Sequence, residues 1–172
     1  MNLEYKNLLD ESFSPDSRVW IYQSSRLFTM SEALAIEDLL NDFTAKWLSH
    51  GTPVKGAGYL FFGQFIILMA DETAMGVSGC STDSSVRFIK NIEQDFQVEL
   101  FDRLMLAFLI QERIQLLPLS QISSYLEDGL INTDTLYFNN TILTKKELLD
   151  HWIIPVKESW LAKRVLEKPK TN

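Results

Sequence analysis

The alternation of apolar and polar positions along the chain predicts a succession of strands and helices that begins near residue 18. Residues 18–23 (RVWIYQ) are rich in β-branched and aromatic side chains, as is typical of a strand. Thr29 and Glu32 then have the spacing of a capping box, which predicts the start of a helix. Apolar residues follow at helical intervals until Gly51 and Pro53 end the helix. This apolar stripe comprises Ile36, Leu39, Leu40, Phe43 and Trp47.

Two apolar runs predict a hairpin after this helix. Residues 57–62 and 65–70 have the composition of strands, and Gly63 followed by Gln64 is typical of the tight turn between them. Both runs are apolar nearly throughout, so at least part of the hairpin is expected to be central in its sheet. A second helix is predicted to start near residues 81–83. Its buried face comprises Val86, Ile89, Ile92 (or Glu93) and Phe96.

The pattern over the following residues completes an α+β fold. Residues 103–110 predict a strand, and residues 113–117 return from it after a turn at Gln111-Glu112. The first 110 residues therefore have the order β-α-β-β-α-β, which is that of the ferredoxin-like fold, an antiparallel sheet with helices on one face. We expect a single domain over residues 1–172. It comprises an N-terminal extension (1–17), the split βαβ core (18–110), a C-terminal extension with a hairpin strand and helices (111–166) and a frayed tail (167–172).

Helices are expected to dominate the C-terminal extension. Ser120 is a candidate N-cap for a short helix that ends at Gly129. The sequence TKKE at 144–147 is a second capping box, and it predicts a helix that includes Trp152. A last helix is predicted over residues 156–166.

Charge and composition narrow the classes of function. The 172 residues include 16 basic and 23 acidic side chains, and the resulting net charge of −7 argues against a nucleic-acid partner held by phosphate contacts. A single cysteine excludes an intrachain disulfide. Together with only two histidines, it excludes zinc sites that need four Cys or His ligands. We predict no metal and no cofactor.

The chain has no sequence feature of export or of membrane insertion. Residues 1–10 (MNLEYKNLLD) have no basic start, no long apolar core and no cleavage site, so they do not resemble a signal peptide. The most apolar run, residues 59–70, is about 12 residues long, whereas a spanning helix needs about 20. We therefore expect a cytoplasmic protein with no membrane partner.

The glycines give no nucleotide-binding motif. Gly56-Ala57-Gly58 is a G-x-G, but it precedes an aromatic strand instead of opening a helix, as a dinucleotide fingerprint requires. The chain contains no G-x-x-x-x-G-K-[ST] sequence, so no P-loop is available for ATP.

The most informative polar stretch is residues 78–90 (SGCSTDSSVRFIK). Five consecutive hydroxyl or carboxylate residues lead into the second predicted helix, which is more polarity than capping requires. The free amides and dipole of a helix N-terminus can stabilise a thiolate at Cys80 or hold an anion. Alternatively, the serines cap the helix and Cys80 packs as a small side chain. The ligand-binding candidates in this turn are Ser78, Cys80, Ser81, Asp83, Ser84 and Arg87, and Cys80 is also the candidate nucleophile.

Gln23 and Arg26 are the remaining ligand-binding candidates. Both follow the first predicted strand, and Arg26 is a cation that we would look for near an anion at the Cys80 turn. In the simplest split βαβ topology, however, the end of the first strand and the start of the second helix lie at different ends of the sheet. The pattern alone does not establish that the two segments meet.

Three segments carry a resemblance to a known family. In residues 19–26 (VWIYQSSR), 78–90 and 151–160 (HWIIPVKESW), the chain resembles a family of small uncharacterised bacterial proteins that are often labelled "ABC transporter ATPase". The resemblance covers nearly the whole chain, and residues 78–90 are its most specific part. The label implies ATP hydrolysis, but this chain lacks the Walker A loop and the family supplies no catalytic residues to transfer. We therefore expect no ATPase activity.

Two classes of function remain open on the sequence. Four tryptophans and eleven phenylalanines exceed the needs of a small core and favour a non-catalytic binding or assembly protein, in which aromatic residues line an oligomer interface or a ligand cleft. A homo-oligomer is among the partners that this hypothesis allows. The alternative is an anion-binding protein or thiol-dependent enzyme that uses the turn at residues 78–87. We take the binding protein as the prediction.

Overall fold

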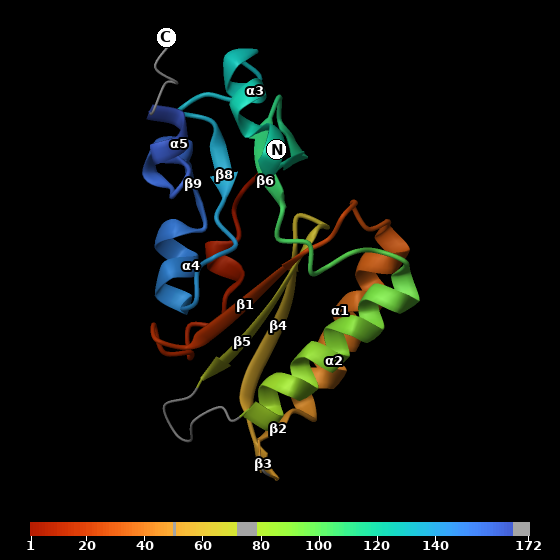
Figure 1. Ribbon diagram of the computed structural model, residues 1–172. Helices are drawn as coiled ribbons and strands as arrows, with labels where there is room; N and C mark the ends of the chain where they lie inside the picture. Colours follow the sequence, from red (N-terminus) through yellow and green to blue (C-terminus); the bar gives the residue numbers. More distant parts are fainter. Residues whose placement is uncertain (50, 72–78, 167–172) are drawn as a thin grey trace. The chain divides into compact units, whose positions relative to one another are not determined.

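The structure is a computed structural model that describes residues 1–49, 51–71 and 79–166, without the side chains of 79–81, 165 and 166. Tertiary contacts divide the chain into two units (Figure 1). The N-terminal unit consists of Asn2–Asp102 and Asn140–Leu149, and the C-terminal unit of Met1, Arg103–Asn139 and Asp150–Asn172. The expected core and extension do not coincide with these units, because residues 103–110 belong to the second unit and residues 140–149 to the first.

The N-terminal unit is built on a three-stranded antiparallel sheet. Its strands are β1 (Arg18–Gln23), β4 (Lys55–Phe61) and β5 (Phe65–Asp71), in the order β1-β5-β4. Ile67 of β5 pairs with a residue of each neighbour, and every residue of β5 before Asp71 is buried. The apolar hairpin therefore supplies the central strand, as its composition predicts, while β4 lies at an edge.

The turn between β4 and β5 lies one residue earlier than the sequence pattern indicates. Phe62 and Gly63 both have positive φ angles, of 55° and 62°, and the amide of Gln64 donates to the carbonyl of Phe61. A phenylalanine in this left-handed region is uncommon. Neighbouring contacts stabilise the turn, because the amide of Phe28 donates to the carbonyl of Gly63 at 2.9 Å.

Two helices, α1 (Met30–Ala45) and α2 (Gly79–Phe96), lie together on one face of this sheet (Figure 1). The predicted capping box at Thr29 and Glu32 is confirmed, with both reciprocal hydrogen bonds present. The apolar stripes of both helices and the facing strand residues form one core. It includes Tyr22, Phe28, Ile36, Leu40, Ile66, Leu68, Ile89 and Ile92.

Gly56 and Gly58 allow α1 to approach β4 closely. A Cβ atom at Gly56 would lie 2.6 Å from Cε3 of Trp47, and one at Gly58 would lie 2.9 Å from Cδ2 of Leu40. Both distances are below normal van der Waals contact. The G-x-G motif is therefore a packing feature of the helix–sheet interface.

Short elements complete this unit. The strands β2 (Leu48–Ser49) and β3 (Thr52–Pro53) form a small hairpin after α1. The N-terminal segment contains the single 3₁₀ turn η1 (Lys6–Leu8). Helix α4 (Lys145–His151) begins at the predicted second capping box, because the amide of Glu147 donates to Thr144 Oγ1 and the Glu147 carboxylate accepts from the Thr144 amide.

The C-terminal unit contains a second antiparallel sheet with the order β7-β6-β8-β9. Its strands are β6 (Met105–Ile110), β7 (Arg113–Pro118), β8 (Leu136–Phe138) and β9 (Ile153–Pro155). The helical elements are η2 (Leu119–Gln121), α3 (Ile122–Glu127), η3 (Val156–Glu158) and α5 (Ala162–Leu166). The core of this unit includes Leu106, Phe108, Ile110, Ile122, Tyr137 and Leu161.

The α+β class with antiparallel sheets is confirmed, but the structure does not have the expected ferredoxin-like topology. That topology would place the strand at 103–110 in the first sheet, whereas β6 pairs with β7 and β8 in the second. Residues 143–145 take the edge of β1 that this strand would occupy, because the amide of Val19 donates to the carbonyl of Leu143 and the amide of Lys145 donates to the carbonyl of Ser17. The amide of Ser25 donates to the carbonyl of Glu99, and Leu100 is buried in the core. Residues 97–100 are thereby held at the end of β1.

Three details of the C-terminal region also differ from the sequence expectation. The helix expected to include Trp152 ends at His151, and the chain continues as β9 to pair with β8. The last expected helix is divided into η3 and α5. Ser120 lies within η2 instead of capping α3, although the left-handed Gly129 does follow that helix. After His151, the pairing of β9 with β8 outweighs helix propensity.

Substituting Gly58 by alanine tests the close packing of α1 on β4. The new methyl group would lie 2.9 Å from Cδ2 and 3.0 Å from Cβ of Leu40. We expect G58A to lower the free energy of unfolding by about 1–3 kcal/mol, as measured by urea denaturation.

The background variant Leu40→Ala provides the control for this experiment. It gives the added methyl group space, so the cost of G58A should fall by about 1 kcal/mol or more in that background. Equal costs in both backgrounds would contradict the packing argument.

Candidate binding groove along an edge strand

The polar turn singled out in the sequence leads into the start of α2. Ser78 lies outside the described residues, while Cys80 and Ser81 belong to the first turn of the helix, with side chains outside the described part. Asp83 and Arg87 are exposed to solvent. The function of this turn as an anion or thiol site therefore stays a prediction.

Gln23 and Arg26 lie at the other end of α2. Arg26 donates through Nη2 to the carbonyl of Phe96, the last residue of the helix, at 2.7 Å. Cys80 lies 16 residues earlier, or about 24 Å along the helix at 1.5 Å per residue. Gln23 instead accepts a hydrogen bond from Asn140 at 2.9 Å. The structure does not bring the candidate residues at the two ends of the helix together.

Arg26 stabilises the junction between three elements. Its Nη1 and Nη2 atoms each donate to one carboxylate oxygen of Glu32 at 2.9 Å, in addition to the bond to Phe96. Glu32 also accepts from the amide of Thr29 at 2.7 Å. The hydrogen bonds from Arg26, followed by that from Thr29, lower the pKa of Glu32 from 4.5 to about 2. Arg26 thus has a structural role that its position in the sequence did not reveal.

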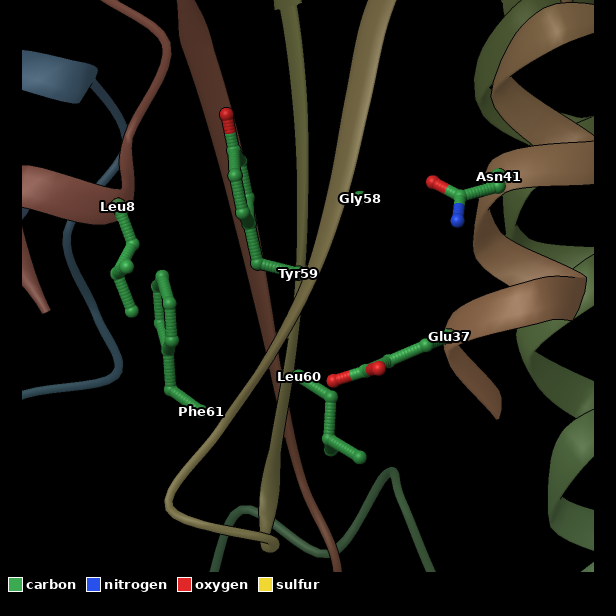
Figure 2. A pocket seen from close by; sticks show the side chains of 7 residues that line it. All are labelled: Leu8, Glu37, Asn41, Gly58, Tyr59, Leu60 and Phe61. Carbon is green, nitrogen blue, oxygen red and sulfur yellow. The ribbon is translucent and has the colours of Figure 1, made fainter. Parts of the chain in front are cut away.

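A groove of about 320 Å³ runs along the free edge of β4 (Figure 2). Among the described strands, β4 pairs with β5 alone, so its opposite edge has no strand partner. The groove lies wholly within the N-terminal unit. Its lining residues are Leu8, Glu37, Asn41, Gly58, Tyr59, Leu60 and Phe61.

One side of the groove is formed by α1. Glu37 and Asn41 are four residues apart, so both project from the same face of the helix. Their side chains extend toward β4, with Glu37 directed at the region of Leu60 and Asn41 at Gly58 (Figure 2). This side of the groove is therefore polar.

The other side of the groove is apolar and comes from the opposite face of β4 and the N-terminal segment. Tyr59 and Phe61 stack with ring centroids 5.4 Å apart, and Phe61 packs on Tyr5 at 5.6 Å. The Tyr59 hydroxyl accepts from the amide of Asp10 at 3.1 Å, and burial raises the pKa of this tyrosine. Leu8 contributes an exposed side chain to the same side, with 64% of its surface accessible.

The N-terminal segment that carries Leu8 is anchored by a buried lysine. The ammonium group of Lys145 donates to the carbonyls of Asp10 and Phe13 at 2.8 and 2.9 Å, and the residue is 7% exposed. The hydroxyl of Tyr5 donates to the carbonyl of Leu148 at 2.6 Å. These bonds hold η1 beside β4.

The sequence does contain a signal for this groove. Edge strands in natural proteins are commonly protected by charged residues, proline or a bulge. Strand β4 (KGAGYLF) has a single charge, on Lys55 at its first residue, and that charge pairs with Asp71 at 3.3 Å. The near absence of charge in residues 55–61 could have indicated an unprotected strand edge. The sequence did not show, however, which of the two hairpin strands lies at the edge of the sheet.

The described residues contain neither a metal-binding cluster nor a membrane helix. In the ranges that the structure describes, His, Cys, Asp and Glu residues do not form groups of three or more that could hold a metal ion. No helix in those ranges combines the length and apolarity needed to cross a bilayer.

Comparisons with known proteins do not assign the chain to a family. No family model matches it, and neither does any curated protein or solved structure. The resemblance to small bacterial proteins labelled as ATPases therefore stays a prediction.

The variant Glu32→Gln tests the structural role of Arg26. The amide keeps a hydrogen-bond acceptor for Thr29 but loses the charge that faces Arg26. Because the pKa of Glu32 is lowered from 4.5 to about 2, its ionised form stabilises the fold above pH 4.5, and this stabilisation is lost as the pH falls toward 2.

We expect the melting temperature of E32Q to be lower than that of the wild type at pH 7, with the difference shrinking between pH 4.5 and 2. The control is Glu37→Gln, which removes an exposed carboxylate from the same helix and leaves the ion pair of Arg26 with Glu32 intact. A difference for E32Q that stays constant from pH 7 to 2 would contradict the assigned interaction.

Proposed function

We propose that this protein is a non-catalytic binding protein that adds an extended segment of a partner polypeptide to the free edge of β4. In this mode, called β-strand addition, main-chain hydrogen bonds provide affinity and alternate side chains provide specificity. The observation that carries the proposal is the groove along β4, an edge strand whose outer side pairs with no described strand and whose single charge, on Lys55, lies at its first residue.

A strand bound at the free edge of β4 would have one face toward each side of the groove. Neighbouring strands lie about 4.8 Å apart, and successive side chains point to opposite faces of a sheet. A strand beside β4 would place one set of side chains against Glu37 and Asn41. The other set would contact Leu8 and the edges of Tyr59 and Phe61. The two sides of the groove match the two faces of a bound strand.

The lining residues favour binding over catalysis. Of the seven, only Glu37 is ionisable in the ordinary pH range, and the hydroxyl of Tyr59 is engaged by the amide of Asp10. A nucleophile paired with a base, which covalent catalysis requires, is not found among them. The backbone of β4 is the principal hydrogen-bonding surface that the groove offers.

Binding of a model strand tests this proposal. The probe is a nine-residue peptide of alternating valine and serine, acetylated at its N-terminus and amidated at its C-terminus, which combines strand propensity with no charge. We expect it to protect backbone amides of residues 55–61 from hydrogen exchange. The same peptide N-methylated at every residue has lost its amide donors and should not protect them.

Two matched variants locate the binding site. Leu8→Asp alters the groove, whereas Leu27→Asp alters a leucine of similar exposure, 59%, that does not line it. Losing the partial burial of one leucine costs about 1 kcal/mol, so L8D should lower the affinity for the peptide about five-fold. L27D should leave the affinity unchanged. Absence of protection in β4, or equal effects of the two variants, would contradict strand addition.

A further inference from the structure

We propose, building on strand addition at β4, that the natural occupant of the groove is a basic partner strand. It carries Lys or Arg on the face toward Glu37, and apolar residues on the face toward Leu8, Tyr59 and Phe61. This inference rests on the proposed function and specifies its ligand.

The spacing of α1 matches the spacing of a bound strand. Residues four apart on a helix are separated by about 6 Å along its axis, and residues two apart on a strand by about 6.8 Å. Asn41 and Glu37 consequently face consecutive same-face positions, beside Gly58 and Leu60 respectively (Figure 2). The residue of the partner strand opposite Leu60 therefore meets a carboxylate, and the one opposite Gly58 meets an amide.

The charges of α1 favour a cation at that position. The helix contains four acidic residues, of which Glu32 pairs with Arg26 and Asp42 with Lys46. Glu37 makes no ion pair or hydrogen bond with any described residue, and its exposed carboxylate lines the groove. A Lys or Arg on the partner strand would supply the missing opposite charge.

The same charges disfavour a second copy of this chain as the occupant. Pairing of two β4 strands about a two-fold axis would bring two acidic α1 helices over the same sheet face. Each copy has a net charge of −7. The single basic residue of β4 is Lys55, and it already forms an ion pair with Asp71 of the same copy. Charge complementarity therefore favours a different, basic polypeptide.

The apolar side of the groove determines the alternate positions of the partner strand. Leu8 is 64% exposed, and Tyr59 is half-buried and stacks on Phe61, which is itself buried. Apolar side chains at every second position would cover this surface. The ligand is thus a strand in which apolar and basic or polar residues alternate.

Three peptides of equal length test the charge preference. Valine alternates with lysine in the first, with serine in the second and with glutamate in the third, and their affinities are measured by fluorescence polarisation. We expect the lysine peptide to bind about three-fold more tightly than the serine peptide, the range of an exposed ion pair, and the glutamate peptide more weakly than both. Raising the salt concentration to about 0.5 M should remove these differences.

Two variants with the same change in net charge show whether the charge preference comes from Glu37 itself or from the net charge of the protein. Glu37→Lys should reverse the order of the lysine and glutamate peptides. Asp38→Lys, which changes the neighbouring exposed residue outside the groove lining, should retain the order. Thermal melting of both variants should match that of the wild type, which shows that they are folded.

The outcomes distinguish this inference from the proposed function. If the serine peptide protects β4 but Glu37→Lys and Asp38→Lys alter the charge preference equally, strand addition stands and the inference of a basic partner strand is overturned. If none of the peptides protects β4, both proposals fail. If sedimentation shows a dimer that Leu8→Asp dissociates, the occupant is a second copy and the basic ligand is overturned.

Discussion

The close approach of α1 to β4 is the constraint on which the N-terminal unit depends. Gly56 and Gly58 leave space for the side chains of Trp47 and Leu40, so the helix lies directly over an edge strand instead of over the middle of the sheet. This placement buries the apolar stripe of α1. It also brings Glu37 and Asn41 to the open edge of β4, where they become the polar side of the groove.

Local patterns predicted much of the secondary structure. The capping boxes at Thr29 and Thr144 and the β4–β5 hairpin depend on residues within a few positions of one another, and each is present. Assignment of strands to sheets depends instead on contacts distant in the sequence. The amide of Ser25 meets the carbonyl of Glu99, and β6 pairs with β8, so a correct order of elements led to the wrong topology.

The candidate site shows the same division between local and distant information. Polarity at residues 78–87 pointed to a helix N-terminus, and the helix is there, but the sequence could not indicate that Arg26 binds the opposite end of that helix. The groove was missed for a physical reason. It is formed by three segments, around Leu8, Glu37 and Tyr59, that no short-range pattern relates, and its main feature is that no described strand pairs with the outer edge of β4.

The position of Lys145 in the chain has a consequence for biosynthesis. Residues 140–149 belong to the N-terminal unit, yet they are translated after residues 103–139, which form part of the other unit. A nascent chain can assemble the β1-β5-β4 sheet and its helices early, because domains tend to fold as they emerge from the ribosome. The ammonium group that anchors Asp10 and Phe13 is supplied only later. Leu8 thus reaches its final place late in synthesis, and the groove is completed after the sheet and the helices that form the rest of it.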